Sequence, residues 1–188
     1  MKPFSFTSIK PAQIFLIFSF FALLTYGNAV NYPFVHDDVV FIVNNPNIKS
    51  FALKDIFKPK EIEGPASELV NVYYRPLIEL VYRIQYKLFG FQSYAYHSFN
   101  IVIHLINTFL LYIFLRKIFP SRINSNFLIA LFFLIHPVQT EAVACISGIS
   151  NLLLSLVMFS GLLLYLISRE YKNKGHYIGA LILSLIHI

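Results

Sequence analysis

The sequence is poor in charged residues and in cysteine. Lys, Arg, Asp and Glu make up 13% of its 188 residues, whereas a soluble domain carries about 25%. Together with long apolar runs and a mean hydropathy of +0.65, this shortage of charge excludes an ordinary soluble domain and indicates an integral membrane protein. The single cysteine, Cys145, excludes an internal disulfide framework, and no Cys/His spacing typical of a zinc site is present.

The formal net charge of +6 does not indicate a nucleic-acid-binding protein. Such proteins gather their basic residues on one polar face. Here the basic residues lie in short clusters between apolar runs. We therefore expect the membrane as a partner, and no nucleic acid.

The apolar runs predict an all-α polytopic membrane protein, because a spanning helix needs ~20 residues. The runs predict spans at about 13–30, 98–115, 127–145 and 152–167, an incomplete span at 177–188, and an outer loop at 31–95. A secretory signal peptide is the alternative for the first run, since Gly27 and Ala29 suit a cleavage site. The fifth run stops at Ile188, which predicts a chain truncated within a span.

The positive-inside rule predicts the orientation of these spans. Three basic clusters alternate with the spans and fall on one side: Lys2 and Lys10; Arg116, Lys117 and Arg122; Arg169, Lys172 and Lys174. We therefore expect a cytoplasmic N-terminus, with the long loop and the connection after His136 facing the periplasm or an organelle lumen. A bacterial inner membrane and an endoplasmic reticulum membrane both fit.

Two adjacent carboxylates, Asp37 and Asp38, open the long outer loop. Adjacent like charges repel, and at a half-desolvated surface the ionised pair is costly unless something binds it. These two residues are therefore candidates for a binding or catalytic role. The ordinary alternative is an acidic turn that caps a helix end.

The same loop holds a second candidate group, Tyr74 and Arg75, directly before Pro76. Proline suits the first turn of a helix, and apolar residues follow at helical spacing at Leu77, Leu80, Val81, Ile84 and Leu88. This pattern predicts an amphipathic helix that lies in the membrane interface. An arginine at a helix N-terminus is a good phosphate clamp, and snorkelling of Arg75 to the interface is the alternative.

A polar stripe runs along the predicted second span. His97, Asn100, His104 and Asn107 follow one another at steps of three and four residues, which places them on one helix face. Such a stripe faces a wet cavity or the bundle interior, or serves interhelical hydrogen bonds. His97 and His104 are separated by a rise of ~10.5 Å, too far to bind one metal ion together.

A third polar group interrupts the predicted third span. Pro137 bends or restarts the helix and leaves backbone that must find other partners. His136 and Glu141 flank this break, and we expect them at the same membrane level as the aspartate pair. The alternative for Glu141 is simple complementation of a helix dipole.

Together these motifs resemble the TMTC family. The similar stretches are Phe34-Val-His-Asp-Asp38 with Asn44-Asn-Pro46, Tyr74-Arg-Pro-Leu77, Tyr96-His97 with Asn100 and His104, and His136-Pro-Val-Gln-Thr-Glu-Ala-Val143 with Gly148 and Asn151. They run in order over residues 30 to about 165. The chain departs from the family at His36, where an aromatic such as Trp is expected, and at Gly148-Ile-Ser-Asn151, where Gly-Arg and an acidic or polar residue are expected. The tetratricopeptide repeats expected after the membrane part are absent from this sequence.

The resemblance implies a glycosyltransferase of the GT-C fold, similar to protein O-mannosyltransferases. Such an enzyme takes a sugar from a polyprenyl-phosphate carrier and transfers it, with inversion, to a Ser or Thr hydroxyl of a protein acceptor. One of Asp37 and Asp38 would act as the base and the other would orient the acceptor or help to hold a divalent metal, which the sequence does not require. Arg75 would neutralise the departing phosphate, while Tyr74, His97, Asn100, His104, His136 and Glu141 would shape the substrate sites.

Two other functions stay open at this point. A non-catalytic membrane anchor or scaffold would tolerate loss of Asp37 and Asp38. A transporter would place its polar groups near the membrane midplane, whereas here they gather at the outer rim. For the 188-residue chain alone we expect no transferase activity.

Overall fold

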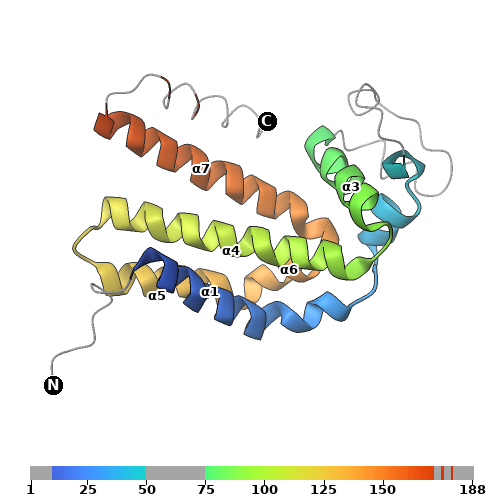
Figure 1. Ribbon diagram of the computed structural model, residues 1–188, viewed down its shortest axis with the longest axis horizontal. Coiled ribbons are helices and arrows are strands. Elements are labelled where there is room, and N and C mark those ends of the chain that lie inside the picture. The colour runs from blue at the N-terminus through green and yellow to red at the C-terminus, as the bar shows by residue number, and fades with distance from the viewer. Residues whose placement is uncertain (1–9, 50–74, 172–174, 176–178, 180–188) are drawn as a thin grey trace.

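The computed structural model describes residues 10–49 and 75–171, together with residues 175 and 179 (Figure 1). Within these residues all regular structure is helical and no strand occurs. The α-helices are α1 (Pro11–Tyr26), α3 (Pro76–Phe89), α4 (Ser93–Ile118), α5 (Ile123–Ile135), α6 (Thr140–Ala144) and α7 (Ile149–Tyr171). Short turns of 3₁₀ or π helix lie at Gly27–Asn31, Val39–Val43, Pro46–Lys49, Pro137–Gln139 and Ile146–Gly148.

Three helical segments of the described chain are long and apolar enough to cross a membrane: Pro11–Asn31, Ser93–Ile118 and Ile146–Glu170. A fourth candidate is broken, because Ile123–Ile135 and Pro137–Ala144 meet at an angle of 46°. The described part of the chain is therefore all-helical with three to four candidate spans, which confirms the class expected from its composition. The predicted run at 177–188 lies outside the described residues, apart from residue 179.

The bounds of α4 and α5 differ from those of the apolar runs that predicted the second and third spans. α4 begins at Ser93, five residues before the predicted span, and thereby includes His97. α5 begins at Ile123 and stops at Ile135, directly before His136 and Pro137. Near the start of α4 the His97 side chain finds a partner inside the bundle, so this helix is longer than its hydrophobicity alone indicates. Helix α5 is shorter than the predicted span, because it ends before Pro137.

Helix α4 lies at the centre of the bundle, with α1, α5 and α7 around it (Figure 1). The buried side of α1 carries residues four apart, and these pack against α4 and α5: Ile14, Phe18, Ala22 and Tyr26. The Phe18 ring stacks on Phe127 of α5, with ring centroids 5.3 Å apart. On the other side of α1 Phe20 is 62% exposed and Leu24 is 69% exposed. An apolar face left open in this way is what a helix facing lipid requires.

The bundle has two chemically different ends (Figure 1). The basic end holds the start of α1, the end of α4, the start of α5 and the end of α7, with Lys10, Arg116, Lys117, Arg122 and Arg169. There Lys117 Nζ lies 2.6 Å from Glu170 Oε2 and links α4 to α7. The opposite end, named the acidic end after Asp37, Asp38 and Glu141, holds the short turns that follow α1 and helices α3 and α6. It also carries Arg75, Arg83 and Lys87, so its charges are mixed, whereas the basic end is mainly positive.

Candidate functional site

The aspartate pair lies in a tight turn after α1. The backbone N–H of Asp38 donates to the Val35 carbonyl at 2.9 Å, and the Val35 N–H donates to Asp38 Oδ2 at 3.3 Å. Between them His36 has a φ of 46°, a left-handed conformation that is uncommon for a residue with a side chain. Backbone in such a conformation persists only where its surroundings hold it.

The two aspartates have different environments. Asp38 is fully buried, and its Oδ1 accepts a hydrogen bond from the backbone N–H of Ser147 at 2.7 Å. Asp37 is exposed. The turn therefore directs one carboxylate into the protein and leaves the other at the surface.

The segment that receives Asp38 is the connection between α6 and α7. The Asn100 side chain of α4 donates from Nδ2 to the carbonyls of Cys145 at 2.9 Å and Ile146 at 3.3 Å. At Gly148 the backbone passes so close to α6 that an added Cβ would lie 2.5 Å from the Ala142 carbonyl oxygen. Since no side chain fits there, the connection is packed directly against the backbone of α6.

The polar stripe of α4 makes hydrogen bonds to the backbones of other segments. His97 Nε2 lies 3.1 Å from the Tyr32 carbonyl oxygen, His104 Nε2 lies 3.0 Å from that of Leu134, and Asn107 Nδ2 donates to that of Leu152 at 2.9 Å. All of these α4 side chains are buried. Their contacts are the interhelical hydrogen bonds that were one of the two expected alternatives, and a substrate-binding role of His97, Asn100 and His104 stays a prediction.

The proline break after α5 is compensated from two sides. In a continuous helix the Leu134 carbonyl would accept from the N–H of Val138, but here that N–H donates to His136 Nδ1 at 3.1 Å. The Leu134 carbonyl instead accepts from the Tyr26 hydroxyl at 2.9 Å and faces His104 Nε2. Helices α1 and α4 thus supply the hydrogen bonds that the break removes, as the membrane interior demands.

Replacing Tyr26 by Phe is expected to lower the stability of the folded protein modestly, because His104 still occupies the Leu134 carbonyl. Single interhelical hydrogen bonds in membranes average about 0.6 kcal/mol. We expect a lower melting temperature in detergent for Tyr26→Phe than for Tyr94→Phe, in which the ring is 52% exposed. Equal melting temperatures for the two variants would contradict this account of the break.

The charges of Arg75 and of the two aspartates influence the pKa of Tyr82 in α3, a residue that no sequence motif indicated. Burial raises the pKa of the Tyr82 phenol, the charges of Asp38 and Asp37 raise this pKa further, and the charge of Arg75 lowers it. Arg75, which precedes the first residue of α3, is exposed. The three charged groups therefore influence one buried phenol, whereas Tyr74 lies outside the described residues.

Glu141 belongs to the same acidic end. Burial raises the pKa of the Cys145 thiol, and the charges of Asp38, Glu141 and Asp37 raise it further. Glu141 is exposed in the first turn of α6, and His136 is half-buried before the Pro137 turn. The structure thus brings the aspartates, Arg75 and Glu141 to one end of the bundle. The described residues contain no group of three or more His, Cys, Asp and Glu that could hold a metal ion.

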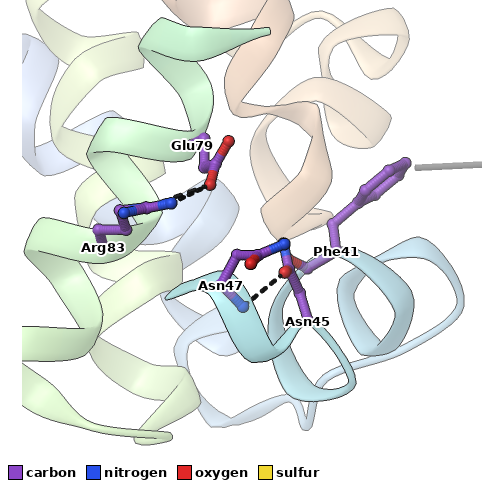
Figure 2. A network of polar contacts seen from close by, with 5 residues as sticks. All are labelled: Phe41, Asn45, Asn47, Glu79 and Arg83. Atoms are coloured by element: carbon purple, nitrogen blue, oxygen red, sulfur yellow. Dashed lines mark hydrogen bonds and ion pairs between the residues drawn. The ribbon is translucent and has the colours of Figure 1, made fainter. Parts of the chain in front are cut away.

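The Asn44-Asn-Pro46 motif forms a second turn beside α3 (Figure 2). Asn45 donates from Nδ2 to the Phe41 carbonyl at 3.2 Å and accepts at Oδ1 from the N–H of Asn47 at 3.0 Å. On the neighbouring helix Arg83 pairs with Glu79 (Figure 2). Between these two elements lies a cavity of about 520 Å³ lined by Ile48, Lys49, Arg83, Tyr86, Lys87 and Gly90, none of them a predicted site residue. The asparagine motif therefore closes its own turn, and residues of this turn and of α3 line the cavity between them.

The structure also identifies which face of α3 is covered. Tyr82, Arg83 and Gln85 are buried, whereas Leu88 is 67% exposed. Within the apolar stripe that predicted an interfacial helix, Leu77, Ile84 and Leu88 are exposed. Val81 of the same stripe packs against the buried cluster around Tyr82. Tyr82 could not be predicted as part of the site, because a tyrosine among apolar residues does not reveal which charged groups lie near it in the folded protein. The role of the Ser147 backbone N–H could not be predicted either, because every residue except proline carries this group.

The helices and their acidic end define an all-helical protein with three to four candidate membrane spans and a charged site at one end. Comparison with known proteins then identifies the family. The chain is 33% identical over 164 residues to protein O-mannosyl-transferase TMTC1 of Homo sapiens, covering 84% of this chain and 18% of that protein. It is 32% identical over 165 residues to protein O-mannosyl-transferase F38B6.6 of Caenorhabditis elegans, covering 85% and 24%.

A third relative, protein O-mannosyl-transferase TMTC3 of Mus musculus, is 33% identical over 151 residues, which cover 79% of this chain and 16% of that protein. No family model and no solved structure matches the chain. These relatives confirm the family that the motifs predicted: the chain is homologous to the TMTC protein O-mannosyl-transferases. It spans between 16% and 24% of the length of the curated relatives that it matches.

Proposed function

We propose that the chain is part of a membrane glycosyltransferase. The enzyme moves a sugar, mannose or another hexose, from a polyprenyl-phosphate carrier to a Ser or Thr hydroxyl of a protein. The observation that carries the proposal is the exposed carboxylate of Asp37, held in a fixed turn at the same end of the candidate spans as Arg75. The relatives' name, protein O-mannosyl-transferase, supports the choice of sugar and acceptor.

In this reaction Asp37 acts as the general base. Its carboxylate takes the proton of the acceptor hydroxyl, and the hydroxyl oxygen forms a bond to the anomeric carbon of the sugar. The bond between that carbon and the phosphate oxygen breaks, and its electron pair leaves with the polyprenyl phosphate. Attack from the face opposite the phosphate inverts the anomeric centre without a glycosyl-enzyme intermediate.

Arg75 offsets the negative charge that develops on the departing phosphate. A fixed positive charge stabilises a transition state most where new negative charge appears. Helix α3 begins directly after Arg75, so its free backbone N–H groups support the same anion. Glu141 and His136 border the carrier site from the α5–α6 side of the acidic end.

The orientation of the spans is part of the proposal. With the basic end in the cytoplasm, as the positive-inside rule favours, the acidic end lies at the periplasmic or luminal face. The helices then belong to a GT-C-like membrane domain, and the open apolar stripe of α3 lies in the membrane interface. A lipid-linked donor enters from the membrane and a protein acceptor from outside.

Sugar transfer by the full-length parent protein tests this function. The purified parent, in liposomes, is supplied with polyprenyl-phosphate mannose or glucose and a Ser/Thr-containing peptide or protein, and glycosylated product is measured by mass spectrometry. We expect donor-dependent O-linked product, and none with the corresponding nucleotide sugar. A parent that transfers sugar from none of these carriers would favour the anchor or scaffold function instead.

A further inference from the structure

Asp38, the buried aspartate, has a different environment from its neighbour Asp37. Both carboxylate oxygens of Asp38 accept backbone hydrogen bonds, Oδ1 from Ser147 at 2.7 Å and Oδ2 from Val35 at 3.3 Å. The residue is fully buried. A carboxylate that is enclosed and occupied in this way cannot reach the hydroxyl of a protein acceptor.

One of these hydrogen bonds is local, and the other joins two segments that lie far apart in the chain. Val35 belongs to the turn of Asp38 itself, whereas Ser147 follows 109 residues later. The Ser147 segment is itself immobilised, because Asn100 holds the carbonyls before it and Gly148 packs against the Ala142 backbone. Asp38 therefore joins a strained turn to a rigid one.

The strain in that turn makes the link consequential. His36 keeps its left-handed φ of 46° between Val35 and Asp38, the two residues whose hydrogen bonds close the turn. Without the contact to Ser147 the local hydrogen bonds and the packing of Phe34 on Tyr96 would still hold this conformation, but Asp38 itself would lose its tie to the bundle and Asp37 within the turn would gain freedom. Displacement of a reacting group by about 1 Å can cost on the order of 100-fold in rate.

We propose that Asp38 is a positioning residue, which locks the Phe34–Asp38 turn onto the Cys145–Gly148 connection and thereby sets the place of Asp37. The inference rests on the proposed function, in which Asp37 is the base. It assigns the two carboxylates of the pair to different tasks: Asp38 binds backbone, and Asp37 meets the substrate. Charged and titratable groups facing Asp38 come from α3, α4, its own turn and the α6–α7 connection: Tyr82, His97, Asp37 and Cys145.

The test compares Asp38→Asn, Asp38→Ala and Asp37→Asn in the full-length parent. Asparagine at position 38 keeps an oxygen that can accept from Ser147, so we expect Asp38→Asn to retain activity within about 10-fold of wild type. Alanine removes the link, and we expect a loss on the order of 100-fold in kcat. The acid limb of the kcat/KM profile against pH belongs to the base, so it should persist in both variants at position 38 and be lost in Asp37→Asn.

Amide hydrogen exchange of the same proteins gives a second readout that does not depend on turnover. We expect Asp38→Ala to speed exchange in peptides covering Phe34–Asp38 and Cys145–Gly148, and Asp38→Asn and Asp37→Asn to leave it near the wild-type rate. This pattern supports the link even if the alanine variant is fully inactive.

The outcomes separate the inference from the function on which it rests. If Asp38→Asn is as inactive as Asp37→Asn, or loses the acid limb, Asp38 takes part in the chemistry and the inference is wrong. If Asp38→Ala keeps wild-type activity and wild-type exchange, the link has no positioning role. If the wild type transfers no sugar, the proposed function fails, while the exchange rates alone still support or overturn the link between the two turns.

Discussion

Replacing Asp37 by Asn in the full-length parent is expected to reduce kcat/KM for sugar transfer by on the order of 10²–10⁴-fold, the range that a general base contributes. The amide has nearly the size of the carboxylate but cannot accept the acceptor's proton. Because Asp37 is exposed and its side chain is not part of the hydrogen bonds that close its turn, folding and membrane insertion should be unchanged. Initial rates with a polyprenyl-phosphate sugar, measured beside expression level and melting temperature, check this.

Two matched variants make the result interpretable. Glu170→Gln replaces a carboxylate by an amide at the basic end, where Glu170 pairs with Lys117, so transfer should stay at the wild-type rate. Asp37→Glu keeps a carboxylate but lengthens its stem, and we expect partial activity. If Asp37→Asn transfers sugar at the wild-type rate, Asp37 is not the general base, and the scaffold function is favoured.

The class of the fold was predictable because it depends on properties that each segment carries within itself. The length of an apolar run and the sign of the charges at its ends are local features, and they predicted a helical membrane protein. The amphipathic spacing after Pro76 likewise predicted a helix there, and α3 spans Pro76–Phe89. The proline break was predictable for the same reason, since Pro137 removes a backbone donor wherever it lies in a helix.

The arrangement of the site was only partly predictable, because it depends on contacts between distant segments. The sequence indicated that His104 and Asn100 lie on one face of α4, but it could not show that this face points at the Leu134 and Cys145 carbonyls. It also treated Asp37 and Asp38 alike. Their difference arises from the left-handed His36 and from a backbone N–H that any residue at position 147 except proline would offer.

Gly148 shows how such hidden contacts can be tested. We expect Gly148→Ala to destabilise the protein strongly, because the new Cβ would lie 2.5 Å from the carbonyl oxygen and 2.8 Å from the Cα of Ala142. Both are backbone atoms, so neither can rotate away, and α6 or the Cys145–Gly148 connection must move. Overpacking of this kind costs about 1–3 kcal/mol or more. Thermal unfolding in detergent measures the loss, and sugar transfer should fall with it as Ser147 moves away from Asp38.

The chain offers a matched control at Gly27, where an added Cβ meets nothing within 4 Å and φ is −56°, a helical value that alanine adopts readily. At a compatible site, glycine to alanine stabilises a protein by about 0.4–1 kcal/mol through the unfolded state. The same substitution should therefore act in opposite directions at the two glycines, raising the melting temperature for Gly27→Ala and lowering it for Gly148→Ala. If Gly148→Ala melts with or above Gly27→Ala, the connection is not packed against α6 as described. The firm anchor for Asp38 would then be lost, because the fixed place of Ser147 depends on that close contact.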